Sequence, residues 1–200
     1  MTPPPPARAP LVLASASPRR RQLLEMLGIP VEVRPSHIPE VRGEHEEPES
    51  YAARLAREKA LSVARELPGA LVLGADTTVV LGRHVLEKPA DDEDAVRMLM
   101  QLQGHTHRVV TAVALAHDGT VHEAMDVTAV TFRPATEAFL RAYVATGEPR
   151  DKAGAYGIQG YGAALVEKID GDFFGVMGLP VRLVIDLLRR AGWEYRFGAT

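Results

Sequence analysis

Hydrophobic positions along the chain alternate between short apolar runs and amphipathic stretches. The apolar runs at residues 11–14 and 31–33 predict short strands. The stretch between them has helical spacing, with Ser17 as a favourable N-cap, Pro18 suited to the first helical position and Gly28 suited to the exit. Residues 11–33 are therefore predicted to form a strand, a tight loop, a helix and a second strand.

The same patterns predict the later elements. Apolar residues at helical spacing predict four further helices. They cover about residues 49–67, the stretch from a cap at Asp91 to an exit at Gly104, about residues 136–145, and the stretch from Pro180 through Leu188. Residues 71–82 are predicted to form two short strand pieces, interrupted at Gly74, Ala75 and Asp76. Residues 109–116 and 120–132 are predicted to form a hairpin that turns at Asp118-Gly119. Residues 193–197 are predicted to form a final strand.

This order of elements predicts an α/β fold. Strands that alternate with helices, together with one hairpin, favour a mixed, twisted sheet with flanking helices and a cleft between two lobes. Residues 1–10 are rich in proline and are expected to form a flexible lead-in outside the fold. Residues 11–200 contain no internal repeat and no long linker, so they are predicted to form a single domain.

Composition narrows the classes of function. The net charge of −3 gives no overall attraction to a nucleic-acid polymer, so any phosphate site must be local. The chain has no cysteine, which excludes disulfides, thiolate metal sites and a cysteine nucleophile. No apolar run is long enough to cross a membrane, and the N-terminus lacks the apolar core of a signal peptide. A cytoplasmic protein without a membrane partner is therefore expected.

The three arginines at the start of the first predicted helix do not fit a purely structural role. Arg19, Arg20 and Arg21 lie where free N–H groups and the helix dipole already favour anions, so unpaired cations there are unfavourable. Together they predict a site for a phosphate-bearing ligand. A solvated surface cluster is the alternative.

Two charged residues lie in apolar surroundings. Lys59 interrupts the apolar stripe of the second predicted helix, so its side chain must either extend to solvent or meet an anion. Asp76 lies in an apolar run, where it needs a partner such as a metal ion or a catalytic water unless it caps a turn. A pocket shared with the arginines would explain both residues.

The segment at residues 147–180 is dense in glycine, which either forms tight turns or lets the backbone approach a ligand closely. Asp151, Lys152 and Gln159 are polar groups in this frame and suit recognition of a nucleobase edge. His105 and His107 lack the spacing and companions of a zinc site, and His107 is predicted to be a hydrogen-bonding residue at a strand start.

Six strings occur in one order: SASPRRRQLL, ARLAREKA, GADTTVVL, EKP, QGHTHRVVTAV and GEPRDKAGAYGIQG. In this order they resemble the Maf family of nucleoside triphosphate pyrophosphatases over about residues 11–188. The DKAGAYGIQG string resembles the branch that hydrolyses dTTP and UTP rather than the branch that acts on 7-methyl-GTP. The resemblance implies a Maf/inosine triphosphatase-like fold, a homodimer and a role in clearing nucleotide pools.

The resemblance also implies roles for individual residues. It assigns phosphate binding to Ser15, Arg19 and Arg20, pocket cations to Lys59 and Lys88, acidic functions to Glu40 and Asp76, and base recognition to Gln159. Lys152 joins the expected substrate-binding residues. Glu40 and Asp76 are expected to hold a divalent cation, Mg²⁺ or Mn²⁺, and Asp76 also to orient or deprotonate the attacking water.

The chain departs from the family pattern at a few positions. Gln103 replaces a usual serine, Phe173 and Phe174 occupy a stretch that commonly contains tyrosine, and Gly175 replaces a common asparagine. None of these residues belongs to the charged set. The main alternative function is a nucleotide-binding regulator of septum formation without essential catalysis. Motifs of purine-directed inosine triphosphate pyrophosphatases and of P-loop proteins are absent.

Overall fold

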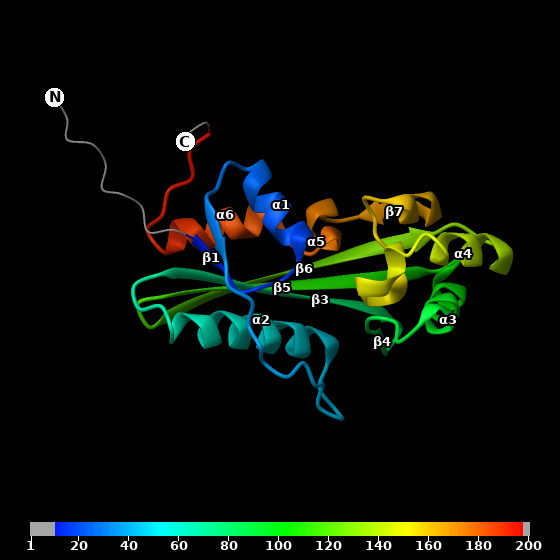
Figure 1. Ribbon diagram of the computed structural model, residues 1–200, viewed down its shortest axis with the longest axis horizontal. Coiled ribbons are helices and arrows are strands. Elements are labelled where there is room, and N and C mark those ends of the chain that lie inside the picture. The colour runs from blue at the N-terminus through cyan, green and yellow to red at the C-terminus, as the bar shows by residue number, and fades with distance from the viewer. Residues whose placement is uncertain (1–10, 198–200) are drawn as a thin grey trace.

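The computed structural model describes residues 11–197 of the chain (Figure 1). Its strands are β1 (Leu11–Leu13), β2 (Val31–Val33), β3 (Leu71–Leu81), β4 (His84–Leu86), β5 (Thr106–His117), β6 (Thr120–Phe132) and β7 (Val166–Asp170). Its α-helices are α1 (Pro18–Met26), α2 (Pro48–Ala64), α3 (Asp92–Leu102), α4 (Glu137–Val144), α5 (Phe173–Met177) and α6 (Val181–Arg190). Three short 3-10 helices, η1 (Glu148–Asp151), η2 (Ala153–Ala155) and η3 (Tyr161–Leu165), lie in the glycine-rich segment.

The strands form one mixed sheet in the order β2-β1-β3-β5-β6-β7, and β4 also pairs with β3. β1 runs parallel to both β2 and β3, whereas the other pairings are antiparallel. One edge of β3 pairs with β1 at residues 71–73 and with β4 at residues 79–81. Between these two pairings, residues 74–78 have no strand neighbour on that edge within the described part of the chain.

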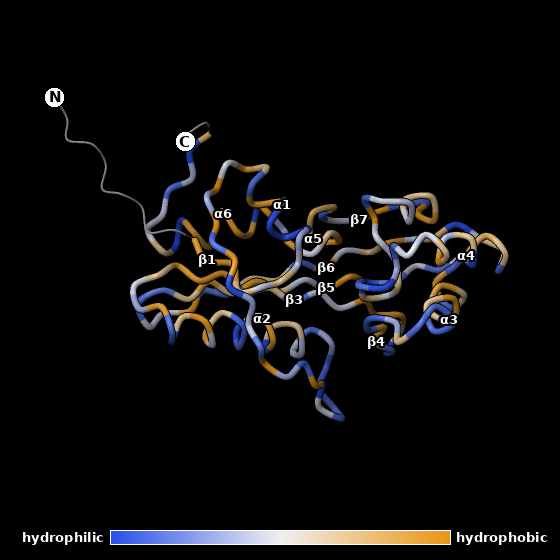
Figure 2. Tube along the Cα trace, in the orientation of Figure 1, coloured by the Kyte–Doolittle hydropathy of each residue, from blue (hydrophilic) through white to orange (hydrophobic). Residues whose placement is uncertain are grey.

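Helices cover both faces of the sheet. α2 lies along one face, and α1, α5 and α6 lie on the other (Figure 1). Successive residues of β3 serve opposite faces, as the alternation of a strand requires. Leu73 and Ala75 belong to the buried cluster with α1 and α6, whereas Val80 packs in the cluster with α2. The distribution of hydrophobic residues along the chain agrees with this arrangement of layers, and the loop between β2 and α2 is mostly hydrophilic (Figure 2).

Two buried hydrophobic clusters define two lobes. The first joins side chains of α1, β1 and α6 to the first half of β3, with Leu24, Leu73 and Leu187 among its fully buried members. The second joins α3 and α4 to the opposite end of the sheet, with Leu99 and Leu140 fully buried. The open edge of β3 at residues 74–78 falls between them. The predicted α/β fold with two lobes is therefore confirmed.

Local capping signals account for two of the helix starts that the sequence predicted. The side chain of Ser17 accepts a hydrogen bond from the backbone N–H of Arg20 at 3.5 Å, and that of Asp91 accepts one from Asp94 at 2.7 Å. The hairpin between β5 and β6 turns at Asp118 and Gly119, where positive φ angles of 45° and 77° fit the turn residues found there.

Two predicted strand features are wrong. β3 is continuous through residues 74–76, because Gly74 lies in the strand where α2 packs against it, and Asp76 finds a partner on α2. Residues 193–197 form no strand. Their chain instead packs back on the first lobe, and the Tyr195 hydroxyl donates a hydrogen bond to the carbonyl of Leu27 at 2.9 Å.

Several short elements were not predicted, namely β4, β7 and α5. The expected flexible lead-in at residues 1–10 lies outside the described residues. Within residues 11–197, no helix is both long enough and apolar enough to span a membrane.

Candidate active site

A pocket of about 340 Å³ opens at the free edge of β3 between the two lobes. The loop after β1, the start of α1, the loop after β2, helix α2, strand β3, the segment after β4 and the glycine-rich segment all contribute to its lining. All nine residues predicted for the site line this pocket, namely Ser15, Arg19, Arg20, Glu40, Lys59, Asp76, Lys88, Lys152 and Gln159.

Arg20 is held rigidly in the wall of the pocket. Its Nε donates to the carbonyl of Gly178 at 2.8 Å, its Nη1 to Ser15 Oγ at 3.0 Å and its Nη2 to Thr77 Oγ1 at 3.2 Å. Burial lowers the pKa of the guanidinium, while the negative charge of Asp76 opposes that effect. An arginine remains protonated even so, and the pocket therefore contains a fixed, buried positive charge.

The three arginines separate in the structure. Arg19 lines the pocket, and its Nη1 lies 2.9 Å from Asp151 Oδ2 on η1. Arg21 lies outside the pocket lining, and its half-exposed side chain pairs with Glu25 one turn further along α1 at 2.6 Å. The predicted cluster of three cations at one site is therefore wrong for Arg21, because the turn of the helix directs it to solvent.

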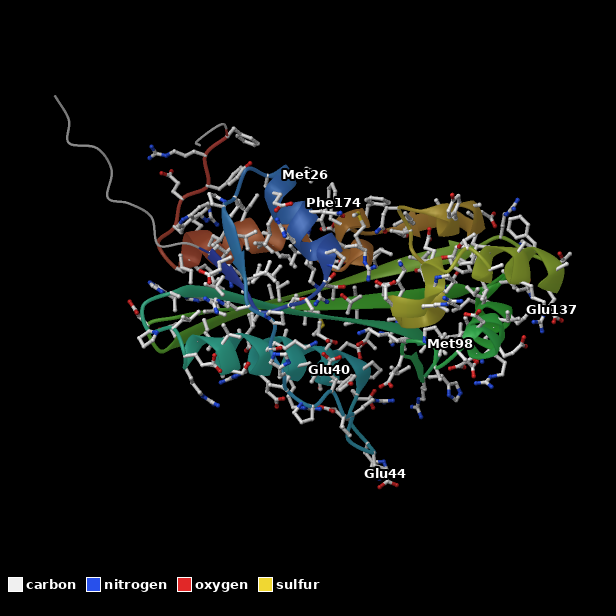
Figure 3. All side chains as sticks on the ribbon, viewed as in Figure 1. Met26, Glu40, Glu44, Met98, Glu137 and Phe174 are labelled. Atoms are coloured by element: carbon white, nitrogen blue, oxygen red, sulfur yellow. The ribbon has the colours of Figure 1, made fainter. Side chains whose placement is uncertain are left out.

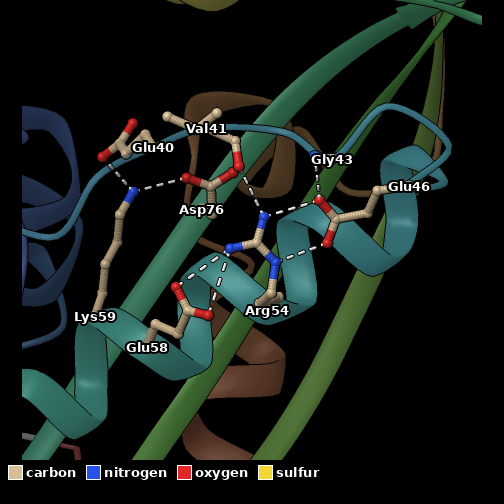
Figure 4. Close-up of polar contacts among 8 residues, drawn as sticks. All are labelled: Glu40, Val41, Gly43, Glu46, Arg54, Glu58, Lys59 and Asp76. Carbon is tan, nitrogen blue, oxygen red and sulfur yellow. Dashed lines mark hydrogen bonds and ion pairs between the residues drawn. The ribbon is translucent and has the colours of Figure 1, made fainter.

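Lys59, Asp76 and Glu40 form a compact charged group (Figure 4). Lys59 Nζ lies 2.7 Å from Asp76 Oδ1 and 2.7 Å from Glu40 Oε1. The side chains of Lys59 and Asp76 are only 7% and 9% exposed. Partial burial opposes ionisation of Glu40, but its hydrogen bond to Lys59 and the charge of that lysine outweigh burial and lower its pKa. The group as a whole carries one net negative charge.

This geometry decides two questions that the sequence left open. Lys59 does not extend to solvent but meets two anions, and Asp76 does not cap a turn but pairs with a lysine. The close approach depends on Gly74, where an added Cβ would lie 2.2 Å from the carbonyl oxygen of Ala56 and 2.7 Å from the backbone nitrogen of Ala60. α2 therefore packs directly on the β3 backbone, and this brings Lys59 within reach of Asp76.

The opposite wall comes from the segment after β4 and from the glycine-rich segment. Lys152 Nζ donates to the carbonyl of Glu148 and to Asp151 Oδ1, both at 2.6 Å. Gln159 lies in an exposed turn at the rim, and Lys88 follows β4. The carbonyl of Glu87 accepts a hydrogen bond from Gly154 N at 3.1 Å. This bond ties the two parts of the wall together.

The carboxylate of Glu148 holds the turn that presents Gln159. It accepts hydrogen bonds from the hydroxyl of Tyr143 at 2.9 Å and from the backbone N–H groups of Tyr161 at 2.7 Å and Gly162 at 3.0 Å. The Glu148 carboxylate therefore anchors the start of η3, directly after the turn that contains Gln159.

Two further residues, Thr77 and Tyr156, contribute to the site without having been predicted as members, whereas Asp151 was one of the groups expected to recognise a nucleobase. Thr77 accepts a hydrogen bond from Arg20, Asp151 pairs with Arg19, and Tyr156 lines the pocket with its hydroxyl 2.8 Å from His107 Nε2. Thr77 directly follows Asp76 in a strand, so it serves the opposite sheet face. The position of Thr77 directly after Asp76 in the sequence is the signal that could have identified Thr77 as a site residue.

One histidine has the role that the sequence predicted. His107 is buried at the start of β5 and is hydrogen-bonded to Tyr156, as predicted. Within residues 11–197, no group of three or more histidine, aspartate or glutamate side chains could hold a metal ion by itself.

The fold and the pocket define an α/β protein whose inter-lobe cleft combines fixed arginines and lysines with two converging carboxylates. A family model described as "Maf-like protein" matches residues 10–191. The chain therefore belongs to the Maf-like family, and the resemblance noted in the sequence is confirmed.

Two proteins with similar sequences have the same name. A protein named dTTP/UTP pyrophosphatase from Koribacter versatilis is 50% identical over 182 residues, which cover 91% of this chain and 94% of that protein. A protein of the same name from Halalkalibacterium halodurans is 45% identical over 188 residues, covering 94% and 99% of the two chains. Among solved structures, a HAM1 protein from Coxiella burnetii is 15% identical with a TM-score of 0.44, covering 62% of this chain and 73% of that one.

Proposed function

We propose that this protein hydrolyses dTTP and UTP to the nucleoside monophosphate and pyrophosphate. The observation that carries the proposal is that one pocket contains Arg19, Arg20, Lys59 and Lys88 together with the carboxylates of Glu40 and Asp76. Fixed cations favour a triphosphate, and acidic groups serve to activate a water. The names of relatives about half identical over nearly the whole chain support the choice of substrate.

Arg20 and Arg19 have distinct tasks in this proposal. Arg20 is already oriented by three hydrogen bonds, so it can stabilise charge on phosphate oxygens without reorganisation. Arg19 pairs with a half-exposed carboxylate that a phosphate can replace. Lys59 and Lys88 contribute point charges, which offset the charge that develops on the leaving pyrophosphate.

Asp76 is the proposed general base. Its carboxylate is held by Lys59 and faces the pocket, where it can accept the proton of a water that attacks the α-phosphorus. The new P–O bond forms as the bridging bond between the α- and β-phosphates breaks, and pyrophosphate departs with the bonding electron pair. The cations of the pocket stabilise that leaving group.

The donor set fits a divalent cation. Glu40 and Asp76 approach the same lysine from two sides, so their oxygens converge on one region of the pocket. Two carboxylates without a third protein ligand suit Mg²⁺ or Mn²⁺, which keep several waters and bind substrate phosphates directly. When bound, such an ion neutralises phosphate charge and lowers the pKa of a coordinated water.

Gln159 and Lys152 are the proposed contacts to the base and sugar side of the substrate. A glutamine amide offers a donor and an acceptor, which match the edge of uracil or thymine. Homodimerisation and a cytoplasmic location are part of the proposal, and light scattering of the purified protein tests the first of them.

A pyrophosphate-release assay across the nucleoside triphosphates, with Mg²⁺ or Mn²⁺ added, tests the proposal. dTTP and UTP should be hydrolysed fastest, and Asp76→Asn should remove most of the turnover while the fold stays intact. Asp126→Asn is the matched control, because Asp126 is a buried, ion-paired aspartate outside the pocket. Tight nucleotide binding with no pyrophosphate release would instead favour a regulator of septum formation.

A further inference from the structure

Glu40 lies in a long loop that contains no regular secondary structure, yet its carboxylate is placed within 2.7 Å of Lys59. The loop spans residues 34–47 between β2 and α2. Val41, the residue after Glu40, is 71% exposed, so hydrophobic packing does not hold this part of the loop in place. Figure 3 shows Glu40 beside α2 and Glu44 at the outer tip of the loop. Besides the ion pair with Lys59, an interaction of the neighbouring backbone is therefore needed to hold the loop at Glu40.

Arg54 on α2 supplies that interaction (Figure 4). Its Nε and Nη2 donate to the two carboxylate oxygens of Glu46 at 2.7 and 2.8 Å, and Nη2 also donates to the carbonyl of Val41 at 3.0 Å. One guanidinium thus binds the loop at two points. One of these points, the carbonyl of Val41, belongs to the residue that directly follows Glu40.

We call the bonds from Arg54 to Glu46 and to the carbonyl of Val41 the clamp. Further hydrogen bonds hold the Glu46 side of this clamp. Glu46 Oε2 accepts from the backbone N–H of Gly43 at 3.1 Å, and the carbonyl of Glu46 accepts from Arg42 Nε at 2.8 Å. The hydrogen bonds from Arg54 are the largest of the effects that lower the pKa of Glu46, to about 2. Glu58, one turn further along α2, accepts from Arg54 Nη1 at 3.3 Å and so orients the guanidinium from its other side. The carboxylate of Glu46 is therefore ionised at neutral pH.

We propose that Arg54 is a positioning residue that holds the loop closed on α2 and thereby sets Glu40 against Lys59 and Asp76. The inference rests on the proposed function, in which Glu40 takes part in metal and substrate binding. Arg54 itself lies outside the pocket lining. Because a planar guanidinium can bind a carboxylate with two parallel bonds and still reach a carbonyl, a neutral side chain cannot replace it.

Arg54→Met tests the proposal, with Arg57→Met as its matched control. Arg57 lies on the same helix and also forms an ion pair, 3.6 Å from Glu123, but among the described residues it forms no hydrogen bond or ion pair with the loop. We expect Arg54→Met to lower kcat at least tenfold and to raise the Mg²⁺ concentration for half-maximal activity several-fold. Arg57→Met should change both by less than twofold.

A second comparison asks whether Arg54 acts through Glu40. In a chain that already contains Glu40→Gln, the added change Arg54→Met should lower kcat by less than twofold. An equal loss of kcat with and without the Glu40 change overturns the proposal. Glu46→Gln breaks the same clamp from the loop side without altering α2, and Glu44→Gln at the exposed loop tip is its control.

Amide hydrogen exchange provides a readout that does not depend on catalysis. Arg54→Met and Glu46→Gln should both increase exchange at residues 41–47, whereas Arg57→Met and Glu44→Gln should not. Unchanged exchange in the first two variants overturns the clamp. If the wild-type protein hydrolyses no nucleotide, the proposed function fails, but this exchange measurement still decides whether Arg54 holds the loop.

Discussion

His107 lies at the start of β5, where burial lowers the pKa of its imidazole to about 4. An unfolded histidine protonates below about pH 6.5, whereas the folded one stays neutral until about pH 4. The free energy of unfolding should therefore fall by about 1.4 kcal/mol per pH unit as pH decreases through this window, or about 3 kcal/mol in total. Above pH 6.5 this contribution is fully present.

Urea unfolding between pH 7 and pH 4 measures this effect. His107→Phe should flatten the pH dependence relative to the wild type, even though loss of the hydrogen bond to Tyr156 lowers stability at every pH. His105→Asn, at an exposed ring two residues earlier, should leave the slope unchanged. A variant at His107 that keeps the wild-type slope would show that other groups cause the acid sensitivity.

At this scale, the members of the pocket could be predicted but their partners could not. Arg20 and Asp76 stand out in the sequence because each breaks a local rule of helix or strand chemistry. The contact between Asp76 and Lys59, by contrast, depends on how α2 packs on β3. Arg54 carries no such signal, since an arginine on an exposed helix face is ordinary in any sequence.

At the scale of elements, the packing of α2 on β3 depends on Gly74. An added Cβ would overlap the backbone of α2 at Ala56 and Ala60, and the helix backbone cannot move at either residue without a cost in free energy. Gly74→Ala should therefore lower the free energy of unfolding by about 3 kcal/mol, at the upper end of the cost of overpacking. It should also lower turnover, because the helix that carries Lys59 must shift. Chemical denaturation with a parallel activity assay measures both, and wild-type stability would contradict the close packing.

The same glycine explains where prediction of elements failed. Glycine in a strand pattern indicates a break or a close backbone approach, and sequence alone does not separate these readings. The helices with caps at Ser17 and Asp91 were predictable because the capping signals are local. The short strands β4 and β7 were not, because pairing with β3 and β6 rather than local pattern defines them. The five-residue helix α5 was also missed, although the Asp172 side chain caps its start and Gly178 ends it.

At the scale of the whole molecule, an ion pair bridges the pocket between the two lobes. Arg19 on α1 lies 2.9 Å from Asp151 on η1, and Lys152 contacts the same carboxylate at 2.6 Å. The carboxylate is half exposed, so a phosphate can replace it as the partner of Arg19. Asp151 therefore competes with the proposed substrate for a cation of the pocket.

Asp151→Asn should accordingly lower KM for dTTP about fivefold, which corresponds to the roughly 1 kcal/mol of an exposed ion pair. The lower KM should also depend more steeply on salt, because an unneutralised cation then faces the phosphate. Asp92→Asn is the control, since Asp92 pairs with Arg150 of the same 3-10 helix at 3.0 Å but lies outside the pocket. Steady-state kinetics at two ionic strengths measure the effect. An increase in KM for Asp151→Asn would mean that this carboxylate holds Arg19 in place for the substrate rather than competing with it.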